Sequence, residues 1–251
     1  MTHKTKGIVL RVVKYGETSL VVTMLTELFG LQSYMVNGVR TSGKAAGKAS
    51  FFQPGAILDM VVYHNQQKNL QRIKEFKWAY LYQNIWDNVL KNSVALYLVE
   101  LLQKCLKQPE AHADLYNFCE DALQQLDMAD KTITANFALF FSLHFCHFLG
   151  FRPQATLYNG AAIVDTANVY FDLQEGEFVE QEPTHPHFID GIAAQTTASL
   201  LRVMQPQELT ALKLNKELRR KLLMAYQDFY ALHINEFGQM KTLSIMQTVL
   251  E

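Results

Sequence analysis

Hydrophobic and polar residues alternate over the first part of the chain, in short runs rich in β-branched and aromatic residues. This pattern is typical of β-strands, and turn signals at near-regular spacing between the runs favour a small closed barrel. The predicted strands cover residues 7–13, 19–26, 31–37, 56–63 and 70–76. Between the second and third strands, Gly30 ends a turn that is expected to need a positive φ.

The pattern changes after about Ala79, where hydrophobic residues recur at steps of three and four. Such spacing predicts helices, which we place at residues 86–102, 115–126, 132–149, 189–204, 207–214, 215–235 and in a short last element from 241. Residues 151–190 interrupt this pattern, and 169–179 predicts a short hairpin that turns at Glu175 and Gly176. We therefore expect an α+β protein, with a barrel domain over 1–78 and a helical domain over 79–251 that contains the hairpin region.

Charge follows the same division. Residues 1–77 contain eleven lysines and arginines and four acids, a net charge of +7, whereas the remainder contains twelve and twenty, a net charge of −8, and the total is −1. A cationic barrel attached to an anionic helical region indicates a polyanionic partner for the barrel only.

Composition excludes several classes of protein. Hydrophobic residues make up 49% and charged residues 19% of the 251 residues, which is typical of a globular protein and not of a disordered one. The odd number of cysteines (Cys105, Cys119 and Cys146) argues against a secreted disulfide framework and fits a reducing compartment. The longest apolar stretch, Phe137 to Leu149, is shorter than the ~20 residues that span a membrane. We expect a soluble, cytoplasmic protein without a membrane partner.

Three stretches together resemble the RecO family of bacterial DNA repair and recombination mediators. The first runs from Gly7-Ile-Val-Leu through Lys14-Tyr-Gly-Glu and Val22-Thr-Met-Leu-Thr-Glu-Leu-Phe-Gly to Val36-Asn-Gly-Val-Arg. The second is Phe148-Leu-Gly-Phe-Arg-Pro, and the third is Tyr230-Ala-Leu-His-Ile followed by Leu243-Ser-Ile. They occur in the family's order and spacing, so the resemblance spans nearly the whole chain.

The resemblance implies an N-terminal OB-fold followed by a helical domain. It also implies a protein that binds single- and double-stranded DNA, anneals complementary strands, contacts the C-terminal tail of the single-stranded-DNA-binding protein SSB, works with RecR and helps to load RecA. It does not imply an enzyme. Many family members have a four-cysteine zinc site at the hairpin, but the matching region, from Phe151 onward, contains no cysteine. We therefore expect a hairpin that has lost its metal, and no cofactor.

The segment from Gly38 to Ser50 contains three glycines, three cations and no acid. Because its backbone is adaptable and its charge is positive, we expect it to contact DNA phosphates, with a merely solvated loop as the alternative. The predicted DNA-binding residues are its cations and three more on or next to the first strand: Arg40, Lys44, Lys48, Lys6, Arg11 and Lys14. A second cluster, Lys68, Arg72, Lys74 and Lys77, fits ordinary surface charge as well as DNA binding.

A basic cluster in the acidic part of the chain is a candidate site for a partner protein. Its cations accompany leucines at four-residue steps, and an acidic tail that ends in a hydrophobic residue needs both kinds of side chain. The predicted residues for the SSB tail are Lys213, Lys216, Arg219 and Arg220, and a solvated amphipathic helix is the favoured alternative.

Catalytic signals are weak. The sequence contains neither a Gly-x-Ser-x-Gly elbow nor a phosphate loop that ends in Gly-Lys-Ser/Thr. His144 and His147 are three residues apart, which makes a metal conceivable there, and His185 and His187 leave the same question open. We interpret the chain as a DNA repair mediator. A protein-binding scaffold with an OB-like barrel, or a metal-dependent enzyme, are the alternatives.

Overall fold

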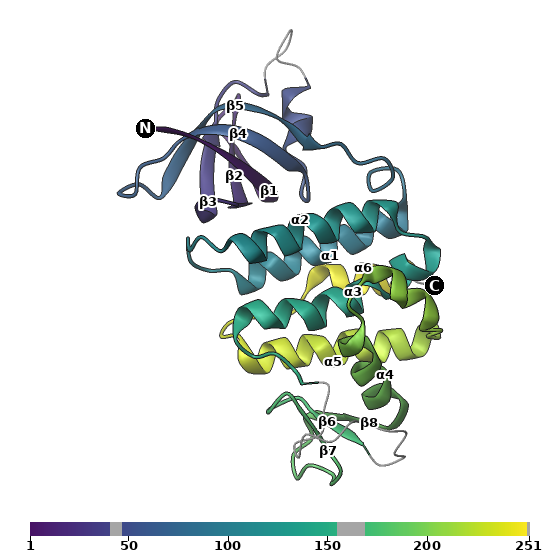
Figure 1. Ribbon diagram of the computed structural model, residues 1–251. Helices are drawn as coiled ribbons and strands as arrows, with labels where there is room; N and C mark the ends of the chain where they lie inside the picture. The colour runs from purple at the N-terminus through teal and green to yellow at the C-terminus, as the bar shows by residue number, and fades with distance from the viewer. Residues whose placement is uncertain (41–46, 155–168, 250–251) are drawn as a thin grey trace. The chain divides into compact units, whose positions relative to one another are not determined.

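A computed structural model of the protein describes residues 1–40, 47–154 and 169–249. The chain divides into two compact units (Figure 1). The first consists of residues 1–86 and 99–127, and the second of 87–98 and 128–251.

Five strands form the closed barrel of the first unit: β1 (Thr2–Tyr15), β2 (Ser19–Thr26), β3 (Gly30–Val36), β4 (Ile57–Tyr63) and β5 (Leu70–Tyr80). Their order around the barrel is β1-β2-β3-β5-β4, and all neighbours are antiparallel except β3 and β5. A short 3₁₀ helix, η1 (Lys48–Phe51), precedes β4. All five predicted strands are confirmed, and the barrel is consistent with an OB-fold.

Alternation along the strands places one set of side chains inside the barrel. Val22, Tyr34 and Val62 are fully buried there and pack with residues such as Met24 and Leu58. Successive strand residues point to opposite faces, so the residues between these lie on the outer surface of the barrel.

Two helical segments complete the first unit. The second half of α1 (Val89–Cys105) belongs to it, and so does nearly all of α2 (Ala113–Met128). The Gln103 side chain donates to the carbonyl of Leu10 on β1 at 2.7 Å. The connection between the helices contacts the start of β3, where a Cβ on Gly30 would lie 2.0 Å from the carbonyl oxygen of Glu110. Gly30 also has a φ of +61°, so both its backbone conformation and its surroundings require glycine.

The second unit is mainly helical. Its elements after α2 are α3 (Lys131–Phe145), η2 (Cys146–Leu149), β6 (Tyr170–Asp172), β7 (Glu177–Val179), β8 (Phe188–Asp190), α4 (Gly191–Arg202), η3 (Pro206–Ala211), α5 (Lys216–His233) and α6 (Lys241–Val249). Asp130 caps α3 by accepting a hydrogen bond from the backbone N–H of Ile133. The segment Lys131–Leu149 is long and apolar enough to cross a membrane, but 67% of its apolar window is buried inside the protein, as in the core helix of a soluble protein.

The predicted hairpin is confirmed as β6 and β7, which pair in antiparallel fashion across a turn at 173–176. A third strand, β8, pairs with the other edge of β6 and makes a three-stranded sheet. The helix expected from Ile189 therefore begins two residues later, at Gly191, because Ile189 lies in β8. A strand of three residues is too short to be distinguished from a helix start by periodicity.

Candidate nucleic-acid interface

Two rows of paired residues cross the outer face of the barrel over β1, β2, β3 and β5. Strand register aligns the first row as Arg11, Thr23, Ser33 and Leu70, and the second as Val13, Val21, Met35 and Arg72. Residues that pair directly across strands point to the same face, so each row is continuous. We call these eight residues the outer rows.

Each of the outer rows contains one arginine, the two arginines lie at opposite borders of the face, and the other six residues are uncharged. Arg11 and Arg72 are exposed, Val13 is 44% exposed, and neither β2 nor β3 contains a charged residue. A strand of DNA lying across this face would meet arginines at both borders without passing over a carboxylate of the rows. Arg11 was predicted to contact DNA from the sequence, whereas Arg72 fitted surface charge as well as DNA binding. The parallel pairing of β3 with β5 brings Arg72 beside Met35 and so into the second row.

Further predicted cations lie near the β1–β2 turn. The backbone N–H of Arg40 donates to the carbonyl of Thr18 at 3.0 Å, and its guanidinium donates to the carbonyl of Gly16 at 3.1 Å. Lys14 is exposed near the end of β1, opposite Leu20. Lys48 is exposed at the start of η1. Lys44 lies outside the described residues.

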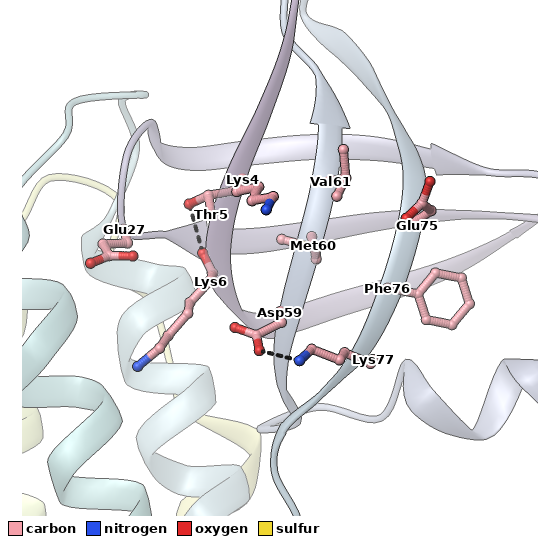
Figure 2. Close-up of a pocket in the computed structure, with 10 residues that line it drawn as sticks. All are labelled: Lys4, Thr5, Lys6, Glu27, Asp59, Met60, Val61, Glu75, Phe76 and Lys77. Carbon is pink, nitrogen blue, oxygen red and sulfur yellow. Dashed lines mark hydrogen bonds and ion pairs between the residues drawn. The ribbon is translucent and has the colours of Figure 1, made fainter.

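Lys6 lies in a different electrostatic setting from the other predicted cations. A groove of about 520 Å³ runs along β1, β4 and β5 (Figure 2), and its charged lining consists of Lys4, Lys6, Lys77, Glu27, Asp59 and Glu75. These are three cations and three acids. Lys77 forms an ion pair with Asp59 at 3.4 Å, and Lys6 donates to both carboxylate oxygens of Glu120 on α2 at 3.0 and 3.1 Å.

The ion pair between Lys6 and Glu120 lies partly inside the protein. The hydrogen bonds that Lys6 donates to Glu120 raise the pKa of Lys6, and the Glu120 side chain is only 9% exposed. Since the charge of Lys6 is offset by a mostly buried carboxylate, the groove offers little net attraction for phosphates.

Three aromatic residues near the basic part of the barrel, Tyr34, Phe51 and Tyr63, differ in exposure. Tyr34 is fully buried in the barrel core, and Phe51 stacks on Trp78 with ring centroids 4.6 Å apart. Tyr63 is 48% exposed and pairs directly with Arg72. Tyr63 is therefore the one of these three that is placed to meet a base beside the outer rows.

The basic cluster of the second unit lies at the start of α5. Lys213, Lys216 and Arg220 are exposed, whereas Arg219 is half-buried and donates to the carbonyl of Leu214. The Arg219 Nε is buried and has no hydrogen-bond acceptor among the described residues, and burial lowers the pKa of this guanidinium. Lys221, the next cation, forms an ion pair with Asp190 at 3.1 Å.

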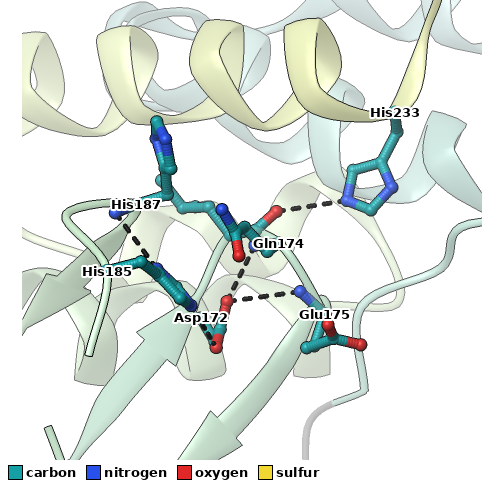
Figure 3. A network of polar contacts seen from close by, with 7 residues as sticks. Asp172, Gln174, Glu175, His185, His187 and His233 are labelled. Carbon is teal, nitrogen blue, oxygen red and sulfur yellow. Dashed lines mark hydrogen bonds and ion pairs between the residues drawn. The ribbon is translucent and has the colours of Figure 1, made fainter. Parts of the chain in front are cut away.

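The hairpin region is held by a polar network (Figure 3). One oxygen of Asp172 accepts the backbone N–H groups of Gln174 and Glu175 at 2.8 and 3.2 Å, and the other accepts from Nε2 of His185 at 3.1 Å. Nδ1 of His185 accepts the backbone N–H of His187 at 3.3 Å, so both ring nitrogens of His185 have protein partners. The residues around this hairpin do not fit a tetrahedral zinc site, because no cysteine is present and the imidazole is already engaged.

The remaining histidines and the cysteines also have structural surroundings. His144 Nε2 donates to the carbonyl of Leu200 at 3.3 Å, while His147 is exposed in η2, so the two rings do not share a face. Within the described part of the chain, no group of three His, Cys, Asp or Glu side chains is placed to hold a metal ion. All three cysteines are buried, and burial raises the pKa of the Cys146 thiol to about 12.

The chain is similar to known proteins along nearly its whole length. Residues 1–82 match the family model described as Recombination protein O N terminal, and residues 87–242 match Recombination protein O C terminal. The DNA repair protein RecO of Azobacteroides pseudotrichonymphae is 31% identical over 251 residues, covering 100% of both chains. The proteins of the same name from Phocaeicola vulgatus and Bacteroides fragilis are 30% and 31% identical, covering 98% and 100% of both chains.

Proposed function

Because the chain belongs to the RecO family of DNA repair proteins, we propose that it binds single- and double-stranded DNA across the outer rows of its barrel and anneals complementary strands. As a member of this family the protein is a recombination mediator and not an enzyme. The observation that carries the binding proposal is the pair of exposed arginines, Arg11 and Arg72, at the borders of strands that contain no charge.

Binding at this face is electrostatic and largely independent of sequence. Each phosphate that pairs with an arginine or lysine releases condensed counterions, which favours association at low salt. Arg40, Lys14 and Lys48, near the β1–β2 turn and at η1, add to the positive charge of the same barrel, and Lys44 lies between Arg40 and Lys48 in the sequence. Two strands held against the same cations repel each other less, so complementary bases pair faster than they do in free solution.

Lys6 contributes less to this proposal than the sequence alone suggested. Its ammonium group is hydrogen-bonded to Glu120, so contact with a phosphate requires breaking an existing ion pair. We keep Arg11, Lys14, Arg40, Lys44 and Lys48 as proposed DNA contacts and add Arg72.

Partner proteins are proposed to dock elsewhere. An SSB tail is acidic and ends in a hydrophobic residue, and the start of α5 presents exposed cations together with the half-buried Arg219, whose Nε has no acceptor among the described residues. The carboxylates of the tail would pair with the exposed cations Lys213, Lys216 and Arg220, which lie next to Arg219 in the sequence. We further propose that the protein acts with RecR to help load RecA on SSB-coated strands, in the cytoplasm and associated with the nucleoid.

A strand-annealing assay tests the proposed function. Complementary oligonucleotides, bare or coated with SSB, should anneal faster with the protein than without it, and the acceleration should fall steeply as salt rises. A version with Arg219→Ala and Arg220→Ala should lose acceleration on SSB-coated strands and keep it on bare strands. Absence of salt-dependent DNA binding would instead favour a protein-binding scaffold.

A further inference from the structure

A pocket of about 570 Å³ lies at one edge of the outer rows, within the first unit. Three parts of the chain line it: the β2–β3 hairpin with Thr23, Phe29 and Ser33, the β4–β5 turn with His64 and Lys68, and the α1–α2 connection with Lys107. Its volume is in the range of small-molecule binding sites.

The charged residues that line the pocket, among those that the structure describes, are all positive. Of the described residues that line it, two are lysines, Lys68 and Lys107, and none is acidic. The groove along β1, β4 and β5 has a similar volume but balanced charge. Uncharged donors and acceptors complete the polar lining, among them Gln66 and Asn69, which are exposed on the β4–β5 turn. The pocket therefore suits an anionic ligand that also forms neutral hydrogen bonds.

One wall of the pocket is formed by stacked rings. The rings of Phe29 and His64 lie nearly parallel, with centroids 3.9 Å apart, and His3 packs edge-on against both. Burial, together with the charges of His3 and the N-terminus, lowers the pKa of His64. The lowered pKa favours the neutral ring of His64 where it stacks on Phe29, and this pair of rings suits a planar ligand.

The β4–β5 turn is ordered in advance of any ligand. Gln71 is buried, and its side chain accepts the backbone N–H of Asn65 at 2.9 Å and donates to the carbonyls of Asn65 and Lys68. Asn65 also accepts the N–H of Gln67 at 2.9 Å. A turn held in this way loses little conformational entropy when a ligand binds.

The α1–α2 connection is held equally closely at the other side. Glu110, in this connection, approaches Gly30 so tightly that a Cβ on Gly30 would lie 2.0 Å from its carbonyl oxygen. Lys107 is thereby kept at the pocket, although it lies far from the barrel in the sequence.

The pocket is continuous with the proposed DNA-binding face. Thr23 and Ser33 line the pocket and also belong to the first outer row, where Thr23 pairs with Arg11. Their hydroxyl oxygens are 3.3 Å apart. A strand that contacts Arg11 therefore reaches the pocket by crossing two adjacent β-strands.

We propose that this pocket holds one nucleotide of a single DNA strand, with its phosphate paired to Lys68 and Lys107 and its base against the Phe29–His64 ring pair. The inference rests on the proposed function, because the strand reaches the pocket from the outer rows. A base inside a duplex is stacked and paired, so the pocket acts on single strands only. It adds a contribution from the base to an interface that otherwise binds the phosphate backbone.

Oligonucleotides with and without bases test the proposal. Binding of oligo(dT) is compared at fixed salt with binding of an abasic strand of the same length, for the full-length protein and two variants. The unmodified protein should prefer oligo(dT) by about tenfold, the effect of one base on an aromatic side chain. His64→Leu, which keeps apolar bulk against Phe29 but removes one planar ring of the pair, should reduce this preference severalfold and leave abasic binding unchanged.

Lys107→Ala is the second variant, and it should not disturb folding because the side chain is exposed in a connection. Lys107→Ala should weaken the binding of oligo(dT) and of the abasic strand equally, and it should lower the slope of log affinity against log salt concentration by about 0.7. Lys131→Ala, an exposed lysine at the start of α3, is the charge-matched control and should change neither.

The outcomes separate this proposal from the proposed function. If the unmodified protein binds both strands equally well, or if His64→Leu keeps the full preference, the pocket does not hold a base, while salt-dependent DNA binding still stands. If neither strand binds, the proposed function itself fails. If an acidic peptide competes with both strands and loses its binding in Lys107→Ala while no base preference is found, the pocket is a protein-docking site and the proposal is overturned.

Discussion

Replacing Asp127 with alanine is expected to destabilise the barrel-containing unit strongly, because this one carboxylate accepts four hydrogen bonds. One oxygen accepts the backbone N–H groups of Asn84 and Ile85 at 2.8 and 2.9 Å. The other accepts the N–H of Gln83 at 2.9 Å and the hydroxyl of Tyr80 at 3.2 Å. Asp127 therefore fixes the chain that leaves β5 to the end of α2.

The loss in the free energy of unfolding depends on which of the four donors can form a hydrogen bond with water once the carboxylate is removed. Asp127 and Ile85 are fully buried, so the Ile85 N–H is left without an acceptor, at a cost of about 1–3 kcal/mol. Gln83 is exposed and Asn84 is half-buried, so their N–H groups and the Tyr80 hydroxyl regain partners and lose only ~0.5–1 kcal/mol each. The free energy of unfolding should fall by about 3–5 kcal/mol. Asp127→Asn should be intermediate, because one oxygen remains while an amide N–H group faces the N–H of Gln83.

Urea denaturation followed by tryptophan fluorescence measures the effect. The two tryptophans, Trp78 and Trp86, both belong to the first unit, so their emission reports on that unit. With a slope of about 2 kcal/mol per molar urea, the midpoint of Asp127→Ala should fall by about 2 M. Asp121→Ala, an exposed aspartate on the same helix, is the control and should change stability by less than ~0.5 kcal/mol. A midpoint for Asp127→Ala equal to that of the control would refute the reasoning.

Three further outcomes are expected. Lys6→Met should lower the free energy of unfolding by about 1–2 kcal/mol, because it leaves the mostly buried Glu120 unpaired while Lys6 itself is partly exposed. The dependence of DNA affinity on salt should not change in this variant. A changed salt dependence would mean that Lys6 belongs to the DNA interface. Burial raises the pKa of Cys146 to about 12, so at pH 8 this thiol should be alkylated about a thousandfold more slowly than a free thiol until urea unfolds the protein. Mass spectrometry measures the labelling. Rapid labelling of Cys146 in the native protein would contradict its burial. Burial lowers the pKa of His144, so the unfolded chain binds a proton at this residue before the folded protein does as the pH falls below about 6.5. The thermal unfolding temperature should therefore decline on acidification, and it should decline less in His144→Gln. The same decline in both proteins would exclude the effect.

Much of the fold was predictable because the strands are long and regularly alternating. The turn glycine Gly30 and the hairpin around Gly176 were recognisable from local sequence alone. The third strand of the small sheet was not, because Ile189 lies in only three extended residues directly before a helix.

The candidate site was predictable only in part, because strand pairing cannot be derived from composition. Lys6 and Arg11 are on the same strand and look alike in sequence, yet Lys6 faces Glu120 while Arg11 borders uncharged strands. The strand contains a bulge between Val9 and Arg11, which shifts the register of the second half. Lys107 had no sequence signal at all, since its place at the barrel depends on the close approach of Glu110 to Gly30.

The most direct test compares two double variants that remove the same charge from different faces of one barrel. Arg11→Ala with Arg72→Ala removes the cations of the outer rows, and Lys4→Ala with Lys77→Ala removes cations from the groove along β1, β4 and β5. The affinity for single-stranded DNA is measured over a range of salt. The proposed interface predicts that the arginine variant loses about 1.4 from the salt slope and the lysine variant almost none. Equal losses in the two variants would mean that net charge alone binds the DNA, and would contradict a defined binding face.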